Sequence, residues 1–351
     1  MKAWVLHGIN DIRLENISQP QIKENEVLVR VKACGVCGSD IPRIYKDGAH
    51  KMPLVPGHEF SGEVVEVGST EYESWLQKPV GIYPLIPCGT CIACQKGTHE
   101  MCRQYSYLGS RRDGGFAEYV AVPAKNLIEL PQNVTFAQAA MLEPMAVAVH
   151  AMRRLSINQT DVVVVCGLGT IGQLLVMFLL EKGVQNILAI GNKDLQKKTV
   201  LALGLPEENI CDSRQQNVEE WLWAHTNETG PDIFFECVGR NETIAQAIDL
   251  TAPGGKVRLI GNPYADMVLE KAVYWKILRN QLYVTGTWNS SFFAGVDEEH
   301  SDWQYVLNRL EEGKIQPEQI ITHSMPMENL EKGFHIMRDK SEEYLKVMTI
   351  L

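Results

Sequence analysis

The sequence predicts an α/β protein with two domains: a barrel-like antiparallel β domain and a doubly wound parallel sheet covered by helices on both faces. Two domains are expected because the chain has 351 residues, and a single hydrophobic core usually stops growing near ~250–300 residues. Short β-type runs broken by Gly and Pro occupy residues 1–145, whereas apolar strands alternating with helix-like segments follow them. These two patterns are typical of an antiparallel sheet and of a buried parallel sheet, respectively.

Three runs carry the prediction of the antiparallel domain. They are VLVRVKACGV at 27–36, GEVVEVG at 62–68 and FAEYVAVPA at 116–124. Each run alternates or is continuously apolar between turn residues, as strands do. The pattern then changes at 146–155, AVAVHAMRRL, which has few helix breakers and predicts a helix.

The second domain is predicted from DVVVVCGLGTIGQLLVMFLLEKG at 161–183, which reads as strand, glycine-rich turn and long helix. Further short apolar strands are expected at 186–191, 232–239, 256–261 and 282–287. Strands that are apolar on both faces, separated by segments long enough for crossover helices, indicate a parallel sheet. The helix-like run at 302–314 and a final short strand are expected to rejoin the first domain.

Composition limits the classes of partner. The formal net charge of −10 argues against nucleic acid, because polyanion binders carry basic surfaces. No run reaches ~18 consecutive apolar residues, so no membrane span is expected. The start of the chain shows no long apolar segment typical of a signal peptide. We therefore expect a cytoplasmic location and a reducing environment.

The segment CGTCIACQKGTHEMC holds four of the nine cysteines, Cys88, Cys91, Cys94 and Cys102. Tight C-x2-C spacing in a reducing compartment favours metal over disulfides. Four thiolates complete a tetrahedral shell around Zn²⁺, which makes a closed, structural site. The alternative is a reduced, metal-free redox loop.

A dinucleotide site is predicted at CGLGTIG, where Gly167, Gly169 and Gly172 fit G-x-G-x-x-G. The strand before it and the helix after it supply the context that the motif requires. A pyrophosphate would bind over the turn formed with Leu168, Thr170 and Ile171, at the helix N-terminus. Val238 completes the expected cofactor-binding set. The alternative is a glycine-containing turn without a ligand.

The end of the second strand favours NADP(H) over NAD(H). An NAD site needs Asp or Glu about 20 residues beyond the glycines, but Gly191, Asn192 and Lys193 stand there instead. The glycine leaves room, the amide can form hydrogen bonds and the lysine is cationic, as a 2′-phosphate requires. Asp194 is the competing ribose ligand, although it can also act as a helix cap.

A catalytic zinc site is predicted from residues spread over the first domain. CGVCGSD contains Cys37 and Ser39, GHE contains His58 and Glu59, and LEP contains Glu143. Cys, His and carboxylate ligands with one open position suit a catalytic Zn²⁺, which lowers the pKa of a bound alcohol. Ser39 would relay the alcohol proton. Taken singly, His58 could be a packed histidine and Glu143 a helix cap.

The ordered combination of Cys37, GHEFSGEVVEVG, the four-cysteine segment and CGLGTIG resembles the zinc-dependent medium-chain dehydrogenase family over essentially the whole chain. CGSDIPRIYKDGAH and LGSRRDGGFAEY are most similar to galactitol-1-phosphate dehydrogenases, followed by sorbitol and other polyol dehydrogenases. The resemblance implies a GroES-like β-barrel catalytic domain, residues 1–147 and 289–351, around a Rossmann domain, residues 148–288.

The resemblance also implies roles for individual residues. Cys37 and His58 match zinc ligands, Glu59 matches a ligand or a neighbouring carboxylate, and Glu143 matches a third ligand or a partner of zinc-bound water. Family members form homodimers or homotetramers, often through the edges of Rossmann sheets. Gly191 departs from the Asp of polyol-phosphate relatives that use NAD, so the substrate could differ as well.

The expected substrate is a polyol or polyol phosphate, oxidised to the matching ketose or formed from it. Arg can grip a phosphate bidentately, so Arg43 and Arg112 are candidate substrate ligands; Tyr45 and His50 are further lining candidates. The alternative for the arginines is a surface or salt-bridged role. Three other functions remain open: an NAD-dependent sorbitol-type enzyme acting on free polyols, a non-catalytic dinucleotide sensor and, least compatible with the charge, a zinc-ribbon nucleic-acid binder.

Overall fold

The computed structural model describes residues 1–293 and 295–351, which form two compact units. Unit 1 contains Met1–Ala146 and Ser290–Leu351, and unit 2 contains Val147–Asn289. The domain boundaries expected from the sequence lie one residue away from these unit boundaries at both points where the chain passes from one unit to the other. The first boundary between the units falls within helix α4, Leu142–Arg153.

Unit 1 is a β domain built on a seven-stranded sheet with the order β16-β17-β3-β4-β5-β9, in which β8 also pairs with β3. Two small antiparallel pairs, β1-β2 and β6-β7, accompany it. The strands are β1 Lys2–Gly8, β2 Asp11–Asn16, β3 Glu26–Val36, β4 Glu59–Val67, β5 Pro79–Ile82, β6 Leu85–Ile86, β7 Ser106–Tyr107, β8 Tyr119–Pro123, β9 Leu127–Glu129, β16 Ile321–Pro326 and β17 Lys346–Ile350.

Short helices connect these strands. They are α1 Asp40–Pro42, a π-helical turn Arg43–Asp47, α2 Ile92–Gln95, α3 Phe136–Ala140, α10 Asp302–Glu311 and α11 Leu330–Asp339, with 3-10 turns at Thr70–Trp75, His99–Met101, Ala124–Asn126, Pro317–Ile320 and Met327–Asn329. Helix α3 begins at a capping box in which Thr135 and Gln138 bond reciprocally, as the T-x-x-Q spacing favours.

One pair in the large sheet departs from the antiparallel expectation. Strands β16 and β17 run parallel, because helix α11 connects them as a crossover. Strand β17 then pairs antiparallel with the C-terminal half of β3, with Thr349 opposite Cys34. The end of the chain thus lies beside the end of β3, which precedes Cys37.

The core of unit 1 is apolar and continuous. It joins inward-facing residues of the sheet to Trp4, Phe116 and Phe334. Trp4 and Phe334 meet edge to face at a centroid distance of 5.8 Å, a favourable aromatic geometry. Cys34, on β3, is fully buried in this core.

Unit 2 is a six-stranded, all-parallel sheet with the order β12-β11-β10-β13-β14-β15. Two half-sheets therefore diverge from the central strand β10, and dinucleotides bind at the carboxyl ends of the strands at such a switch point. The strands are β10 Val162–Cys166, β11 Asn186–Gly191, β12 Ile210–Asp212, β13 Ile233–Glu236, β14 Lys256–Leu259 and β15 Tyr283–Gly286.

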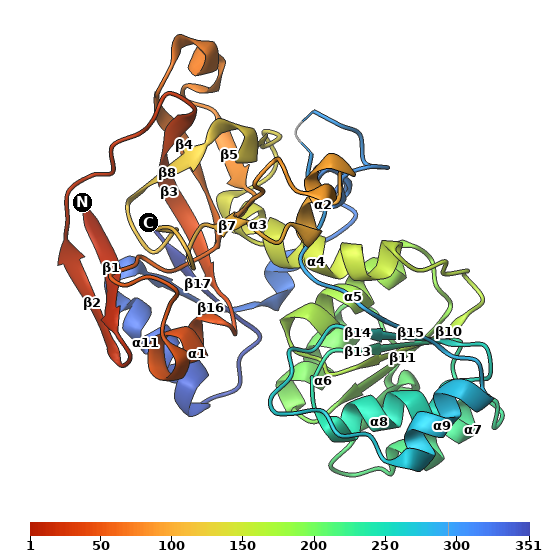
Figure 1. The fold of residues 1–351 in the computed structure, drawn as a ribbon. Coiled ribbons are helices and arrows are strands. Elements are labelled where there is room, and N and C mark those ends of the chain that lie inside the picture. Colours follow the sequence, from red (N-terminus) through yellow and green to blue (C-terminus); the bar gives the residue numbers. More distant parts are fainter. Residues whose placement is uncertain (294) are drawn as a thin grey trace. The chain divides into compact units, whose positions relative to one another are not determined.

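Helices cover both faces of this sheet. They are α5 Thr170–Glu181, α6 Asp194–Ala202, α7 Val218–His225, α8 Asn241–Leu250 and α9 Lys271–Arg279, with a 3-10 turn at Glu207–Asn209. Figure 1 shows α5 and α6 on one face and α7, α8 and α9 on the other. The Rossmann architecture expected from the sequence is confirmed.

No helix within the described part of the chain is both long enough and apolar enough to cross a membrane.

Candidate active site

The four cysteines of the segment 88–102 converge in unit 1. The Sγ atoms of Cys91 and Cys94 are 3.5 Å apart, those of Cys88 and Cys94 are 3.8 Å apart, and those of Cys91 and Cys102 are 3.8 Å apart. Sulfurs bound to one tetrahedral Zn²⁺ at about 2.3 Å would be separated by about 3.8 Å. The observed separations therefore fit a structural zinc site with four thiolate ligands.

The protonation chemistry of this cluster also suits metal binding. Hydrogen bonds from Thr90 lower the pKa of the Cys88 thiol to about 6, which favours the thiolate that binds metal. Burial raises the pKa of Cys94 to about 12. A bound cation would overcome this cost, because a coordinating thiol is deprotonated outright.

A second cluster forms where β3 ends and β4 begins. Ligand atoms of Cys37, His58 and Glu59 all lie within 4.8 Å of one another. Cys37 follows the last residue of β3, His58 immediately precedes β4, and Glu59 is the first residue of β4, opposite Gly35. A Cβ atom at Gly35 would come 2.3 Å from Glu59 Oε2, so only glycine leaves space for this carboxylate.

His58 is oriented by a residue that the sequence reasoning missed. Asp40 is fully buried, and its Oδ1 lies 3.6 Å from His58 Nδ1. The backbone N–H of Cys37 donates to Asp40 Oδ2 at 3.0 Å, and Arg43 donates to Oδ1. Burial acts against ionisation of Asp40, but the combined effect of His58, Arg43 and the backbone N–H of Cys37 outweighs burial and lowers the pKa of the carboxyl. Asp40 is part of CGSD, so an acid three residues after a metal-ligand cysteine was the available signal in the sequence.

Glu59 is held by a second residue that the sequence reasoning missed. Lys346 Nζ donates to both carboxylate oxygens, at 2.8 and 2.6 Å, and both side chains are buried. Lys346 is the first residue of β17, whose pairing with β3 brings the ammonium group to this point. The paired Glu59 carboxylate has charge compensation without a metal, whereas the buried His58 Nδ1 has no hydrogen-bond partner.

Ser39 and Glu143, the other two residues predicted for the catalytic zinc site, both interact with members of this cluster. Ser39 Oγ donates to Cys37 Sγ at 3.3 Å. Glu143, in the first turn of α4, accepts a hydrogen bond from Tyr107 at 3.1 Å. Burial raises the pKa of Glu143, while His58 opposes that shift and Glu59 adds to it. Glu143 thus interacts electrostatically with the cluster but is not among its mutually close donor atoms.

The donor set of the second cluster fits a catalytic zinc. One thiolate, one imidazole and one carboxylate make three protein ligands, the number that leaves a fourth position for water or substrate. A buried imidazole nitrogen faces a carboxylate, as is usual for metal-bound histidine. The two clusters therefore divide into a closed four-thiolate site and a mixed-ligand site.

In unit 2 the glycine turn has the geometry that a pyrophosphate requires. Gly167 has φ +96°, and a Cβ there would come 2.6 Å from Val238 Cγ2. A Cβ at Gly172 would come 2.0 Å from Gly167 O, whereas one at Gly169 would meet nothing within 4 Å. The first and third glycines are thus required by close packing, and the second leaves open space at the N-terminus of α5.

Val238 is positioned by another unforeseen acid. Glu236, fully buried at the end of β13, accepts hydrogen bonds from the backbone N–H groups of Val238 and Gly239 and from Thr243 Oγ1. The β13–α8 turn is therefore fixed beside the glycine turn. This leaves Val238 against Gly167, at the carboxyl end of the sheet.

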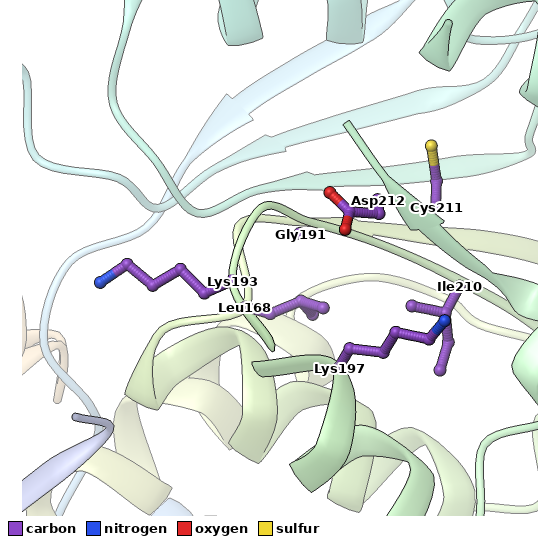
Figure 2. A pocket seen from close by; sticks show the side chains of 7 residues that line it. All are labelled: Leu168, Gly191, Lys193, Lys197, Ile210, Cys211 and Asp212. Atoms are coloured by element: carbon purple, nitrogen blue, oxygen red, sulfur yellow. The ribbon is translucent and has the colours of Figure 1, made fainter. Parts of the chain in front are cut away.

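A small pocket lies at the carboxyl ends of β11 and β12. Its lining residues come from the glycine turn, the end of β11, helix α6 and β12: Leu168, Gly191, Lys193, Lys197, Ile210, Cys211 and Asp212. Figure 2 shows the Asp212 carboxylate close to Gly191, and the Lys193 side chain extending away from the other labelled side chains. The expected residues Gly191 and Lys193 thus share this pocket with an acid, Asp212, that the sequence reasoning did not include.

Asp194 is not the cap of helix α6, because Lys193 is the N-cap residue and makes no side-chain capping bond. The Asp194 carboxylate instead pairs with Arg214 at 2.5 Å. Asn192 donates its backbone N–H to Gln196 Oε1 at 3.3 Å. The turn after β11 is thus held from within α6 and from the segment that follows β12.

The proposed substrate ligands lie in different surroundings. Arg43 pairs with Asp40, and Arg112 pairs with the buried Glu26 at 2.5 Å, at the start of β3. Tyr45 lies under the Arg338 guanidinium at 4.6 Å and beside His335. His50 is exposed. Arg43 is therefore the candidate directly linked to the mixed-ligand cluster, through Asp40.

The comparisons with known proteins agree with both sites. Residues 23–132 match the model of the alcohol dehydrogenase GroES-like domain, and residues 170–312 match that of the zinc-binding dehydrogenase. The galactitol 1-phosphate 5-dehydrogenase of Escherichia coli K12 is 33% identical over 92% of each chain, and a sorbitol dehydrogenase of Halalkalibacterium halodurans is 31% identical over 99% of this chain and 98% of that protein. The crystal structure of the Escherichia coli galactitol-1-phosphate dehydrogenase superposes with a TM-score of 0.91 at 30% identity and full coverage of both chains.

A mixed-ligand metal cluster and a separate four-cysteine site, a glycine turn at the switch point of a parallel sheet, and these two matching family models all lead to one conclusion. The chain belongs to the zinc-dependent medium-chain dehydrogenase family and is an NAD(P)-dependent dehydrogenase.

Proposed function

We propose that the protein transfers a hydride between a secondary alcohol of a polyol or polyol phosphate and NADP(H), with the corresponding ketose as the other product or substrate. The observation that carries this proposal is the convergence of Cys37, His58 and Glu59 in one cluster with three donors. A non-catalytic dinucleotide sensor would not need a metal site with a free position.

The residues around this cluster support an alcohol oxidation. When bound, zinc would act as a Lewis acid on the substrate oxygen, and the nicotinamide would accept the hydride. Asp40 orients the His58 ring, and Lys346 fixes the Glu59 carboxylate. Ser39, whose hydroxyl already lies 3.3 Å from Cys37 Sγ, is suited to carry the alcohol proton away.

The phosphate ester of a polyol is the substrate that Arg43 favours. The Arg43 side chain is 16% exposed and pairs with Asp40, next to the cluster. Arg binds phosphate bidentately, so a guanidinium at this place would recognise the far end of a phosphorylated substrate. Free polyols remain the alternative, because the pairing of Arg43 with Asp40 already satisfies part of its hydrogen-bonding capacity.

Cofactor preference rests on the end of β11. Gly191 leaves room for a 2′-substituent of the adenosine ribose, and Lys193 and Lys197 supply positive charge in the same pocket. The carboxylate that NAD enzymes place here is absent from β11 itself. These features favour NADP(H).

A homodimer or homotetramer that pairs through unit 2 is part of the proposal. Strand β15 lies at one end of the sheet order, and Tyr283 on it is 64% exposed. Tyr274, Trp275 and Leu278 of helix α9 are exposed as well. An apolar surface next to an open sheet edge suits pairing with a second copy. Light scattering after size-exclusion chromatography should give a multiple of 39.4 kDa for the wild type and a smaller mass for Tyr283→Lys.

The first test of function is the absorbance of reduced cofactor, with NADP or NAD and a panel of sorbitol, galactitol, xylitol, ribitol and their phosphates. We expect turnover with one phosphate ester and NADP. Cys37→Ala should abolish turnover while the protein stays folded and binds cofactor. Normal activity of this variant would overturn the proposed catalytic site, and turnover of free polyols alone would overturn the phosphate preference.

Arg43→Ala separates two roles of the guanidinium. If Arg43 binds phosphate, kcat/KM should fall for the phosphate ester but much less for the free polyol. If Arg43 acts only through Asp40 and His58, both substrates should lose equally. Arg112→Ala, which removes an arginine paired with Glu26, is the matched comparison.

A further inference from the structure

One arginine outside the sequence-based set spans the turn where the ribose of a dinucleotide is expected. Arg214 follows β12 by two residues, and Asp212, the last residue of β12, lies opposite Gly191 in the parallel register. Ser213 donates from both its backbone N–H and its hydroxyl to Gly191 O, at 2.9 and 3.3 Å. The segment carrying Arg214 is therefore attached directly to the residue that leaves room for a 2′-substituent.

The guanidinium of Arg214 is held by two carboxylates. Nε and Nη2 donate to Asp212 at 2.9 and 2.6 Å, and Nη2 also donates to Asp194 at 2.5 Å. Asp194 is the first residue of α6, directly after Lys193. The guanidinium consequently bridges from the end of β12 to the start of α6, across the turn formed by Gly191, Asn192 and Lys193.

The two carboxylates differ in how firmly they hold the arginine. The Asp212 side chain is 13% exposed and receives the Arg214 backbone N–H as well, whereas the Asp194 side chain is 86% exposed. An exposed ion pair contributes little, because water competes with it. Asp212 therefore anchors the arginine, and Asp194 is a partner that a more highly charged anion can replace.

Donor capacity remains for such an anion. A guanidinium has five N–H donors, and no hydrogen bond from Arg214 Nη1 is found among the described residues. The nearby lysine is less available, because Lys197 Nζ already pairs with Glu207 at 2.8 Å. Arg214 thus combines a fixed position at this turn with unused donors.

We propose that Arg214 is a specificity-determining residue that binds the 2′-phosphate of NADP(H), exchanging Asp194 for the phosphate while Asp212 keeps the guanidinium in place. This inference rests on the proposed function, since it names the residue that produces the preference for a 2′-phosphorylated dinucleotide. Bidentate contact between Arg and phosphate supplies both the affinity and the discrimination. An unphosphorylated ribose leaves the Arg214–Asp194 pair intact.

The test is calorimetric binding of adenosine 2′,5′-bisphosphate and adenosine 5′-monophosphate, which lack the nicotinamide and need no turnover. Arg214→Gln should weaken binding of the bisphosphate about 10- to 100-fold, the range for losing hydrogen bonds to a charged group, and change binding of the monophosphate less than about 2-fold. Lys276→Gln is the matched control. Lys276, on helix α9 of the same unit, is a half-exposed cation that pairs with Asp249 of helix α8. This control should change neither affinity.

A second variant acts in the opposite direction. Asp194→Asn removes the competing carboxylate and should tighten binding of the bisphosphate several-fold. Weaker binding of the bisphosphate by this variant would overturn the proposal that the phosphate replaces Asp194 as the partner of Arg214.

The outcomes separate this inference from the proposed preference. If the wild type prefers the bisphosphate and Arg214→Gln keeps that preference, Arg214 is not the discriminating residue and the proposed function stands. If Arg214→Gln weakens the binding of both nucleotides equally, the arginine only stabilises the turn. That result also overturns the assignment. Equal affinity of the wild type for the two nucleotides would overturn both the NADP preference and the role of Arg214.

Discussion

Replacing Lys346 with Met should strongly destabilise the protein, because it leaves the Glu59 carboxylate buried without its hydrogen-bonded ammonium partner. The two side chains are 3% and 2% exposed, and Nζ lies 2.6 and 2.8 Å from the carboxylate oxygens. The ammonium group also donates to Val36 O at 3.3 Å. Removing one partner of a buried, hydrogen-bonded ion pair costs about 3–5 kcal/mol.

Urea unfolding of the zinc-loaded protein measures this cost. A loss of about 3–5 kcal/mol should move the midpoint by on the order of 1 M. Zinc content is determined for each variant first, because loss of a metal would itself lower stability. Lys2→Met is the matched control: its pair with Glu328 is also 2.6 Å long, but the side chains are 47% and 53% exposed. The control should leave the midpoint unchanged.

The double variant Glu59→Gln, Lys346→Met tests the electrostatic reason. With both charges removed, it should be more stable than Lys346→Met alone, since no uncompensated charge remains buried. A Lys346→Met variant no less stable than Lys2→Met would refute the argument. A double variant less stable than both single variants would show that packing, and not charge, dominates at this site.

Three further predictions concern the other sites. Cys91→Ser should lose the structural zinc, which atomic absorption would show as one zinc fewer per chain, and should unfold at a lower temperature. Full zinc content in this variant would contradict the four-thiolate site. Gly172→Ala should destabilise the fold, because its Cβ would meet Gly167 O at 2.0 Å, whereas Gly169→Ala should fold normally but bind dinucleotide more weakly; equal unfolding temperatures would refute this. The Asp212 carboxyl should titrate near pH 2 because of its hydrogen bonds to Arg214, so its contribution to stability, present above pH ~4, is lost as the pH falls towards 2. Carbon-detected NMR should show this pKa rise in Arg214→Gln, and an unchanged value would contradict the cause.

Features encoded within short stretches were predictable from the sequence. The four cysteines lie within fifteen residues of one another, so their spacing alone indicates a shared metal, and their Sγ atoms converge in the structure. The glycine turn is recognisable because strand, turn and helix follow one another directly. The strands of unit 2 and helix α5 were likewise visible as apolar runs, apart from β12, which has three residues and gives no periodic pattern.

Other parts of the site depend on chain segments that meet only after folding. Glu59 and Lys346 are 287 positions apart, and no local pattern marks a lysine on the last strand as the partner of a buried acid. Arg214, in the turn after β12, and Asp194, at the start of α6, are 20 positions apart and become neighbours only because β11 and β12 pair in parallel. The parallel β16–β17 pair within a mainly antiparallel sheet was missed for the same reason.

The sequence by itself therefore determined the two-domain α/β class, the metal-ligand types and the dinucleotide turn, because hydrophobic periodicity, cysteine spacing and glycine placement are local properties of the chain. The tertiary structure decided which charges neutralise or orient those groups: Asp40 for His58, Lys346 for Glu59, and Asp212 with Asp194 for Arg214. Strand register and burial set these pairings, and both arise from packing between segments that are distant in the sequence.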